Sequence, residues 1–407
     1  MAQGKWDAVV IGAGPAGASA SRTLTAGGMK CLLIEKKILP RDKMCSGILS
    51  NWAVDFVHRK FGAMPESVYC RPNFIDGAAL HFPSIDEPVI VDSCNPIPNI
   101  WRSHFDNFLA QRSGAVIREG YTLQYIEKHS AGYRVTCKFS KSGRVATESF
   151  TVKYIVGADG ANSRSLNLMM PESVKDLSYG VGMQMHYRGE INLDPKRYHV
   201  FFYPGMGFYA WASFKDEDIH VGSAILGKKG LNVCLENFIS LLKTKYLFKI
   251  RKTVRVEGMA GALKGPLSIF TIGRGNYVAA GDAGGFLHNL GEGISCALTT
   301  GDLAGSAVLT AEETGSDACD IYRLTASDEA ELCLDQFNPL RMLKKTPMPM
   351  DFKSFRRRYS LKDMLAMMND MRKYFKQDNQ SGGAGIGKVI RKNMVYHMFR
   401  GKYPVEL

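Results

Sequence analysis

A glycine-rich turn near the start of the chain constrains the fold more than any other feature. An apolar run over 6–11 leads into GAGPAG at 12–17, and alanine-rich helical sequence follows over 18–24. A second apolar run, 31–34, ends in Glu35, 18 residues beyond the last glycine of the turn. Strand, glycines, helix, strand and acid in this order are typical of a βαβ unit that binds a dinucleotide.

Each part of this turn has a separate physical task. Gly12 permits the tight turn, Gly14 lets the backbone approach a pyrophosphate, and Gly17 allows close packing of helix and strand. The N-terminus of the helix carries partial positive charge for the anion. Glu35 accepts a hydrogen bond from a ribose hydroxyl, and its charge disfavours a 2′-phosphate at that position.

Two later segments repeat the pattern of an apolar strand that ends in a polar, glycine-containing turn. The first, 154–164, reads YIVGADGANSR, and the second, 276–285, reads NYVAAGDAGG and is followed by GEGI at 291–294. Asp159 and Asp282 stand at the strand ends, where a carboxylate can bind a ribityl or ribose hydroxyl. Either segment taken singly also fits a turn with a capping aspartate.

The three motifs together occur in the order and spacing of FAD-dependent oxidoreductases related to para-hydroxybenzoate hydroxylase, and the chain most resembles the geranylgeranyl reductase group. The resemblance covers residues 1 to about 320. PRDKMCSG at 40–47 is similar to the Pro-Arg-x-Lys-x-Cys-Gly-Gly of those reductases. WRSHFDNFL at 101–109 is similar to their Arg-x-x-Phe-Asp-x-x-Leu helix, and PGMGFYAW at 204–211 to their Tyr-x-Trp strand on the substrate side.

Three departures from the reductase pattern concern the substrate more than the cofactor. Ser46 replaces the first of two glycines, and Ser213-Phe214 replaces a Phe-Pro pair. The turn from Gly285 to Gly291 is one residue shorter than usual, with Asn289 where a proline is common.

The resemblance implies FAD as the cofactor and assigns site residues. The expected cofactor-binding residues are Gly12, Gly14, Ala16, Gly17, Glu35, Lys36, Arg41, Cys45, Ser46, Gly47, Arg102, Asp159, Gly160, Gly281, Asp282, Gly291, Gly293 and Ile294. The expected catalytic residues are Cys45, Tyr209 and Trp211.

Each chemical assignment has a plain alternative. The Cys45 thiol either protonates a carbanion-like centre beside the flavin or fills space as a small hydrophobe. Tyr209 and Trp211 alternate on an expected strand and share one face, which either grips an apolar chain or forms sheet core. Arg41 and Arg102 either contact FAD or are solvated. His288, beside the expected ring, is more often structural than catalytic in such a position.

These patterns predict an α/β protein in which a Rossmann-like FAD-binding domain is interleaved with an antiparallel-sheet substrate domain, followed by a helical basic C-terminal region. We assign 1–70, 95–165 and 265–330 to the first domain, 71–94 and 166–264 to the second, and 331–407 to the C-terminal region. Alternating runs at 121–126, 133–139 and 150–156 predict an antiparallel meander on the FAD-binding domain.

Net charge singles out the last part of the chain. The chain of 407 residues carries a net charge of +13, and residues 341–407 hold sixteen Lys and Arg against five Asp and Glu, an excess of eleven. Residues 341–407 also contain nine of the 19 methionines, and apolar residues recur at helical spacing over 361–375. Such a helix suits an anionic membrane surface, a cap over an apolar tunnel, or simple packing on the body. No recognition module for nucleic acid is visible.

Cysteine usage and apolar runs indicate the compartment. Nine cysteines are scattered without a CxxC pair, which argues against a zinc site or a disulfide framework and suits a reducing compartment. No run of about 18 apolar residues and no signal peptide is seen. We therefore expect a cytoplasmic protein, with the basic region as its route to the inner face of the membrane.

The function implied by the resemblance is saturation of C=C bonds in an isoprenoid lipid by reduced FAD. A second GxGxxG is missing, so the electron donor is either NAD(P)H or a ferredoxin-like protein. One alternative is an FAD-dependent aromatic monooxygenase or halogenase on the same fold. Another is a membrane-surface flavoprotein that passes electrons within a complex and holds no small substrate.

Overall fold

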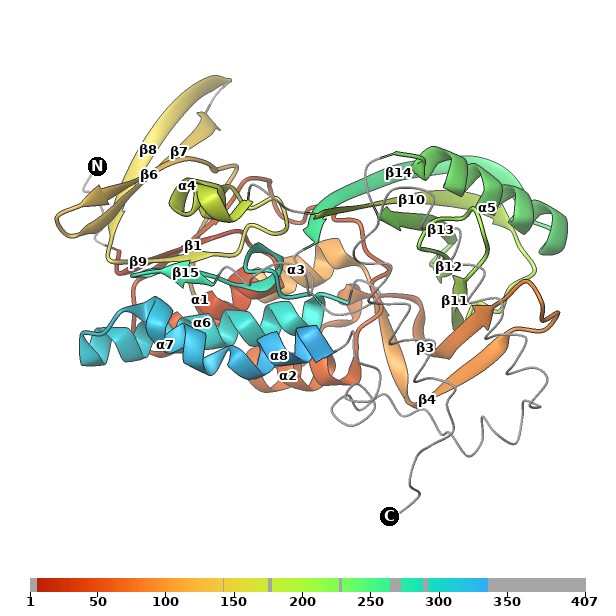
Figure 1. Ribbon diagram of the computed structural model, residues 1–407, viewed down its shortest axis with the longest axis horizontal. Helices are drawn as coiled ribbons and strands as arrows, with labels where there is room; N and C mark the ends of the chain where they lie inside the picture. The colour runs from red at the N-terminus through yellow and green to blue at the C-terminus, as the bar shows by residue number, and fades with distance from the viewer. Residues whose placement is uncertain are drawn as a thin grey trace, which may run out of the picture. The chain divides into compact units, whose positions relative to one another are not determined.

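The computed structural model describes residues 6–141, 143–174, 178–226, 229–263, 272–287 and 292–335. The chain divides into two compact units, and it leaves the first unit twice and returns to it each time (Figure 1). Unit 1 is built from described parts of 1–69, 100–178 and 261–333, and unit 2 from 70–99 and 179–260.

Unit 1 is organised by a six-stranded sheet whose central strands are parallel. In spatial order the strands are β15 Gly273–Arg274, β16 Tyr277–Ala279, β9 Tyr154–Gly157, β1 Ala8–Ile11, β2 Cys31–Glu35 and β5 Val116–Glu119. The edge pair β15–β16 is antiparallel. Every residue of β1, β2 and β9 is buried, as expected for strands covered on both faces.

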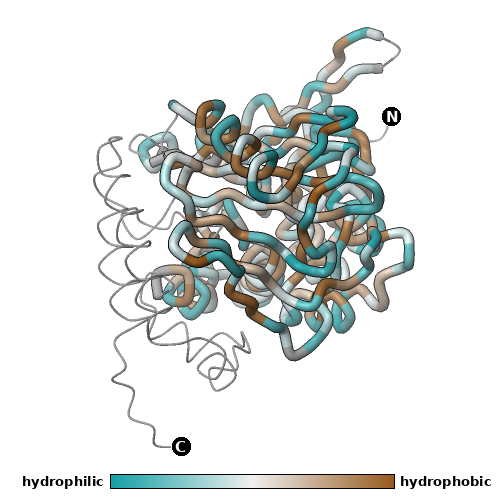
Figure 2. The backbone as a smooth tube through the Cα atoms, turned by 90° about the vertical axis from the view of Figure 1, so that its right-hand side faces the viewer, coloured by the Kyte–Doolittle hydropathy of each residue, from teal (hydrophilic) through white to brown (hydrophobic). Residues whose placement is uncertain are grey.

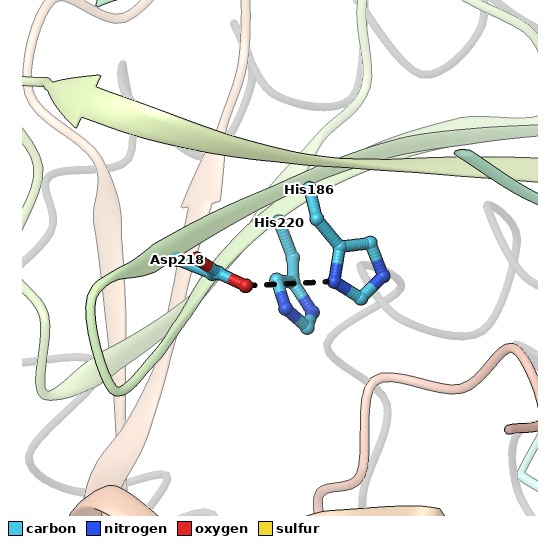
Figure 3. A group of neighbouring side chains, drawn as sticks. All are labelled: His186, Asp218 and His220. Carbon is cyan, nitrogen blue, oxygen red and sulfur yellow. Dashed lines mark ion pairs between the residues drawn. The ribbon is translucent and has the colours of Figure 1, made fainter. Parts of the chain in front are cut away.

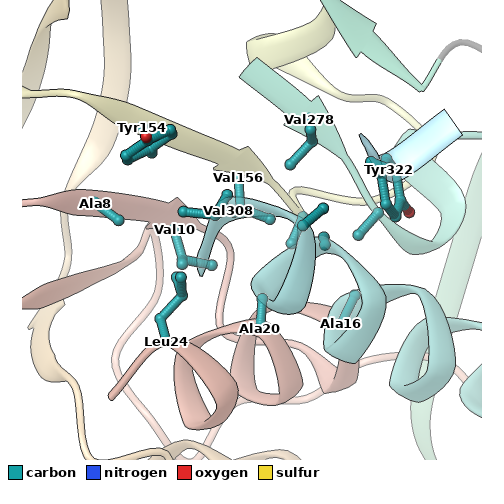
Figure 4. Close-up of a cluster of buried hydrophobic side chains, with 14 of the residues drawn as sticks. Ala8, Val10, Ala16, Ala20, Leu24, Tyr154, Val156, Val278, Val308 and Tyr322 are labelled. Carbon is teal, nitrogen blue, oxygen red and sulfur yellow. The ribbon is translucent and has the colours of Figure 1, made fainter. Parts of the chain in front are cut away.

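Helices α1 Pro15–Ala26, α6 Ile294–Thr314 and α7 Ala318–Thr325 cover one face of this sheet (Figures 1 and 4). Small residues let α1 and α6 approach closely, because a Cβ on Gly301 would lie 2.2 Å from the Ala16 carbonyl oxygen. Among the described residues α6 alone has the length and apolar composition of a membrane span, yet 67% of its apolar window is buried inside the protein. It is therefore a core helix of unit 1.

The opposite face of the sheet carries an antiparallel meander of β6 Thr122–His129, β7 Gly132–Lys141 and β8 Arg144–Val152. The expected third run, 150–156, is divided at Lys153, so its second half is β9 of the parallel sheet. The remaining helices of unit 1 are α2 Asn51–Phe61, α3 Arg102–Gln111, α4 Arg164–Met169 and α8 Ser327–Asp335, with 3-10 turns η1 Glu66–Val68, η2 Pro171–Val174 and η3 Gly281–Ala283.

In its described residues, unit 2 is a seven-stranded sheet with one helix, α5 Leu231–Lys245, on one face. Its strands in spatial order are β14 Lys249–Leu263, β10 Ser178–Glu190, β13 Asp218–Leu226, β12 Tyr209–Lys215, β11 Arg197–Phe201, β3 Tyr69–His81 and β4 Val89–Ile100. The pair β3–β11 is parallel, whereas β10, β13, β12 and β11 pair antiparallel in turn.

The two faces of this sheet differ in chemistry. Side chains such as Phe201, Ala212 and Val221 pack with Phe238 and Leu242 of α5 into an apolar core. The alternate residues, on the other face, are mixed aromatic and polar. Figure 2 shows the resulting short alternation of hydrophobic and hydrophilic residues along the tube.

The predicted α/β class, with a Rossmann-like domain interleaved with a largely antiparallel sheet, is confirmed for the described residues. Of the predicted C-terminal region, 331–335 form the end of α8 Ser327–Asp335, and 336–407 lie outside the described residues. His288, Asn289 and Gly291 also lie outside them.

Candidate functional site

The glycine turn lies at the carboxyl end of β1 and leads into α1. Gly12 has φ +104°, and a Cβ there would lie 2.4 Å from the Ala158 carbonyl oxygen. A Cβ on Gly17 would lie 1.8 Å from the Gly12 carbonyl oxygen. Both glycines are thus required by the packing of the chain itself.

Gly14 is different, because the nearest atom to a Cβ there is Nη2 of Arg41, 3.7 Å away. No side chain caps α1 and no acidic residue stands in its first turn. The described residues therefore do not require glycine at 14, and they leave the N-terminus of α1 open to an external anion. Such a cradle fits the pyrophosphate of a dinucleotide. Ala16, in the same turn, is buried.

The Glu35 carboxylate ends β2 beside this turn and is 4% exposed. It accepts hydrogen bonds from the backbone N–H of Ala13 and of Lys37, each at 3.0 Å. Arg41 Nε lies 3.2 Å from Glu35 Oε2. The acid is therefore held in a fixed orientation at the position expected for a ribose partner, whereas Lys36 is exposed.

A buried ion network extends from Glu35 to α3. Arg41 Nη1 lies 3.0 Å from Asp106 Oδ2, and Arg102 contacts the same carboxylate through Nε at 2.9 Å and Nη2 at 3.0 Å. Burial alone would raise the pKa of Asp106, but Arg102 and Arg41 hold it below its ordinary value of 3.8. Burial alone would lower the pKa of Arg102, and the Asp106 carboxylate raises it overall. Neither arginine is a solvated surface group.

Cys45 lies in the turn before α2, and its Sγ accepts the backbone N–H of Gly47 at 3.3 Å. It also contributes a hydrogen bond and an electrostatic interaction to Arg102. Gly47 has φ +65°, and Ser46 between them is half-buried. The structure thus places a partly buried thiol next to the Arg102 guanidinium.

The two aspartates at the ends of β9 and β16 have different surroundings. Asp159 accepts hydrogen bonds from the hydroxyls of Ser163 and Ser165 and from the Ser165 backbone N–H, at 2.6–2.8 Å, so its carboxylate is engaged with the start of α4. Gly160, with φ +84°, has open space where a Cβ would lie. No hydrogen bond to the Asp282 carboxylate is found among the described residues.

Asp282 lies against the start of α6. A Cβ on Gly293 would be 3.2 Å from Asp282 Oδ1, and the Gly281 N–H donates to Thr300 Oγ1 at 2.8 Å. The first turn of α6, from Ile294, is capped by Glu292, which accepts from the Ser295 N–H at 3.0 Å. Three hydrogen bonds from the chain thus occupy the Asp159 carboxylate, whereas described residues donate none to that of Asp282, so Asp282 has more acceptor sites available to a ligand hydroxyl.

Tyr209 and Trp211 lie on one face of β12 in unit 2, as their spacing predicts, with ring centroids 5.4 Å apart. The Trp211 side chain is 4% exposed, and its Nε1–H donates to Gln184 Oε1 at 3.0 Å. Its indole lies over Gly222, the residue opposite on β13, where a Cβ would be 2.2 Å from Trp211 Cζ2. This face is the one that α5 does not cover.

Replacing Gly222 with alanine is expected to displace the indole and to lower the free energy of unfolding by about 1–3 kcal/mol, because an inserted methyl overpacks the site. Near-UV circular dichroism and thermal unfolding measure the effect. Gly258→Ala on β14 is the matched control, since the nearest atom to its Cβ would be 3.9 Å away. Equal stability of the two variants would contradict the role given to Gly222.

Three residues of these sites were not predicted from the sequence: Asp106, Gln184 and Gly222. Asp106 follows Arg102 by four residues on a helix, a spacing that indicates an ion pair. Gly222, with Val221, belongs to the stretch that resembles the reductases, but its contact with Trp211 depends on strand register, as does the role of Gln184.

Comparison with known proteins gives these sites a chemical context. Residues 5–182 match a family model described as an FAD binding domain. A digeranylgeranylglycerophospholipid reductase of Methanococcus vannielii is 28% identical over 74% of this chain and 76% of its own. A geranylgeranyl diphosphate reductase of Rhodobacter capsulatus is 26% identical over 77% of this chain and 78% of its own.

Solved structures show the same fold. A geranylgeranyl bacteriochlorophyll reductase-like protein of Thermoplasma acidophilum superimposes with a TM-score of 0.68 at 18% identity, over 92% of this chain and 99% of its own. A flavin-dependent halogenase superimposes with a TM-score of 0.60 at 15% identity, over 90% of this chain and 70% of its own. These similarities confirm FAD as the cofactor, an oxidoreductase as the enzyme class, and the resemblance to geranylgeranyl reductases.

Proposed function

We propose that this FAD-dependent oxidoreductase saturates carbon–carbon double bonds in an isoprenoid lipid. The observation that carries the proposal is similarity, over about three quarters of the chain, to two proteins named as reductases of geranylgeranyl compounds. The Tyr209–Trp211 pair on unit 2 supports it, because a partly buried tyrosine ring packed on a buried indole offers an aromatic surface to an apolar chain.

The residues of unit 1 fit the cofactor. Gly14 and the uncapped start of α1 would bind the pyrophosphate, and Glu35 a ribose hydroxyl. Arg41 adds a positive charge beside Gly14, fixed by Glu35 and Asp106. When bound and reduced, FAD supplies the hydride that adds to one carbon of the double bond.

The second carbon needs a proton, which we assign to the Cys45 thiol. Proton loss leaves a thiolate, and the Arg102 guanidinium beside it compensates the new negative charge. Solvent then restores the proton. Hydride and proton together convert the alkene into an alkane, so atoms and charge balance.

Cys45→Ser is expected to slow alkene reduction about 100-fold or more, the usual range for loss of a general acid. Rapid mixing of the reduced enzyme with substrate measures this rate, after the FAD content of the variant has been matched to wild type. Cys234→Ser on α5 serves as the thiol control and keeps the wild-type rate. A wild-type rate in Cys45→Ser would show that the thiol only fills space.

The proposal is tested by anaerobic reoxidation of the dithionite-reduced protein. A lipid with a geranylgeranyl chain should reoxidise the flavin, whereas its fully saturated counterpart with the same headgroup should not. Reoxidation only by air together with an aromatic substrate would instead favour a monooxygenase or halogenase, whose fold is shared. Indifference to every lipid and aromatic compound would favour a protein that passes electrons within a complex.

The natural donor and the location are further parts of the proposal. NAD(P)H or a ferredoxin-like protein would reduce the flavin.

We place the protein in the cytoplasm, at the inner face of the membrane, because residues 341–407 carry an excess of eleven positive charges. Sedimentation with anionic but not neutral vesicles is the expected result, and equal sedimentation with both would contradict it.

A further inference from the structure

A compact group of ionisable side chains lies on unit 2, on the same sheet face as Trp211. His186 of β10 and His220 of β13 are directly opposite in the antiparallel register, and Asp218 precedes His220 by two residues, so all three share one face. Figure 3 shows the three side chains turned toward one another. The imidazole centroids are 3.8 Å apart, and His186 Nδ1 lies 4.0 Å from Asp218 Oδ2.

We propose that His186, Asp218 and His220 form a binding site for a divalent transition metal, with Zn²⁺ as the preferred ion. One ligand atom from each residue lies within 4.8 Å of the others. Ligands about 2.0–2.1 Å from a tetrahedral zinc ion are roughly 3.4 Å apart, so small side-chain rotations close the site. Three protein ligands leave a fourth position, which water takes.

Glu257 of β14 orients the His186 imidazole toward the proposed metal. Its Oε2 lies 3.1 Å from His186 Nε2, the ring nitrogen away from Asp218. A carboxylate that accepts the Nε2–H leaves the lone pair on Nδ1, the atom nearer to Asp218. Histidine ligands of zinc are oriented by a carboxylate in this way. Gln184 Nε2 lies 3.3 Å from the same His186 Nε2, but an amide N–H cannot accept a hydrogen bond, so the Nε2–H goes to the Glu257 carboxylate and the Gln184 Oε1 accepts from Trp211.

The charges around the group are compatible with a cation. Arg188 contacts Oδ1 of Asp218, whereas Oδ2 points to His186. Arg255 contacts the other carboxylate oxygen of Glu257, Oε1, at 3.5 Å. Asp218 can therefore bind a metal ion through Oδ2 while Oδ1 stays paired with Arg188, and Glu257 can orient His186 through Oε2 while Oε1 stays paired with Arg255.

A second group in unit 1 must be distinguished from this one. Cys296, Glu329 and Cys333 also bring ligand atoms within 4.8 Å, with the two sulfur atoms 3.9 Å apart. Burial, and then the neighbouring Cys333, raise the pKa of the Cys296 thiol, which disfavours the thiolate that a metal needs. Zn²⁺ uptake measured in variants of each group distinguishes the histidine site from the cysteine group.

The test uses full-length FAD-loaded protein from which metal has been removed with a chelator. Calorimetric titration with Zn²⁺, and metal analysis after gel filtration, should give one ion per chain. His186→Gln with His220→Gln should abolish binding, whereas Cys333→Ser and His104→Gln, a change of an exposed histidine on α3, should retain it. Absence of Zn²⁺ uptake by the wild type, or loss of uptake in Cys333→Ser with retention in the histidine variant, would overturn the proposal.

Two further readouts do not depend on the histidine variant folding. Co²⁺ added to the wild type should give visible d–d bands of a nitrogen- and oxygen-ligated ion without thiolate charge-transfer absorption, and strong charge-transfer absorption would point to the cysteines. Glu257→Gln should keep the stoichiometry while weakening Zn²⁺ about 10–100-fold, the usual effect of losing an orienting carboxylate. Unchanged affinity would remove Glu257 from the site.

Discussion

Gly17→Ala and Gly14→Ala, two neighbouring changes of the same kind, are expected to fail in different ways. The Gly17 variant should lose both stability and FAD, whereas the Gly14 variant should fold and lose only affinity for FAD. The reason is the environment of each missing Cβ, which is 1.8 Å from the Gly12 carbonyl oxygen at 17 but no nearer than 3.7 Å to any described atom at 14.

The magnitudes follow from packing and from ligand approach. A methyl group at 17 forces β1 and α1 apart, and we expect a loss of about 3 kcal/mol or more in the free energy of unfolding. Alanine at 14 has an ordinary φ of −83°, so the cost there is about 1 kcal/mol or less, mainly from the changed N-cap. Its methyl group faces the pyrophosphate, and FAD affinity should fall about 10–100-fold, or about 1.4–2.8 kcal/mol.

The comparison is made on the apoproteins, because bound FAD itself stabilises the folded state. Urea unfolding gives the stability of each variant, and fluorescence titration gives its affinity for FAD. Normal FAD binding by Gly14→Ala would show that the backbone at 14 is not approached by the cofactor. Normal stability of Gly17→Ala would contradict the described packing of α1 on β1.

Asp106→Asn is expected to have the second largest effect. Asp106 is fully buried between Arg41 and Arg102, so the change leaves two largely buried guanidinium groups without their shared counter-charge. Breaking a buried ion pair from one side costs about 3–5 kcal/mol. Release of Arg41 should also weaken FAD binding, because that side chain lies beside Gly14.

The same carboxylate predicts how stability depends on pH. Its pKa in the folded protein is below the ordinary value of 3.8, so the unfolded chain binds the proton first as the pH falls. The contribution of Asp106 is therefore complete well above pH 3.8 and is lost as the pH falls from there through the folded pKa. The stability difference between wild type and Asp106→Asn should shrink over that acid range and be constant near neutrality.

Denaturant unfolding at several pH values checks this prediction. Asp320→Asn is the control, because the Asp320–Arg323 pair is more than half exposed and such pairs contribute at most about 1 kcal/mol. An effect of Asp106→Asn as small as that of the control would contradict the network. A difference that grows as the pH falls would contradict the sign of the pKa shift.

The parts of the site that were predictable are those encoded within one turn or one strand. The GAGPAG turn fixes a strand-to-helix connection by local sterics, and the alternation of Tyr209 and Trp211 fixes their common face. The parallel sheet followed from the same logic, since its buried strands are short apolar runs between turn residues.

The parts that were not predictable depend on contacts between distant segments. Asp106 meets Arg41 across 65 positions of sequence, and Glu257 meets His186 across 71. Gly222 matters only because the register of β12 on β13 brings it under Trp211. Turns and tertiary packing set which residues of two strands lie opposite each other. The alternation of apolar and polar residues along one strand therefore does not identify the residue opposite on the neighbouring strand. The position of Glu35 at the end of the second strand of the dinucleotide motif was predictable, but its ion pair with Arg41 was not.

The most direct test of the central claim is the mass of the lipid after one anaerobic turnover. Dithionite-reduced protein is mixed with a geranylgeranyl lipid, and the recovered lipid is analysed by mass spectrometry. We predict a gain of two hydrogens for each equivalent of flavin reoxidised. An unchanged lipid mass, with flavin reoxidised only when air and an aromatic compound are added, would contradict the reductase account and favour oxygen chemistry on the same fold.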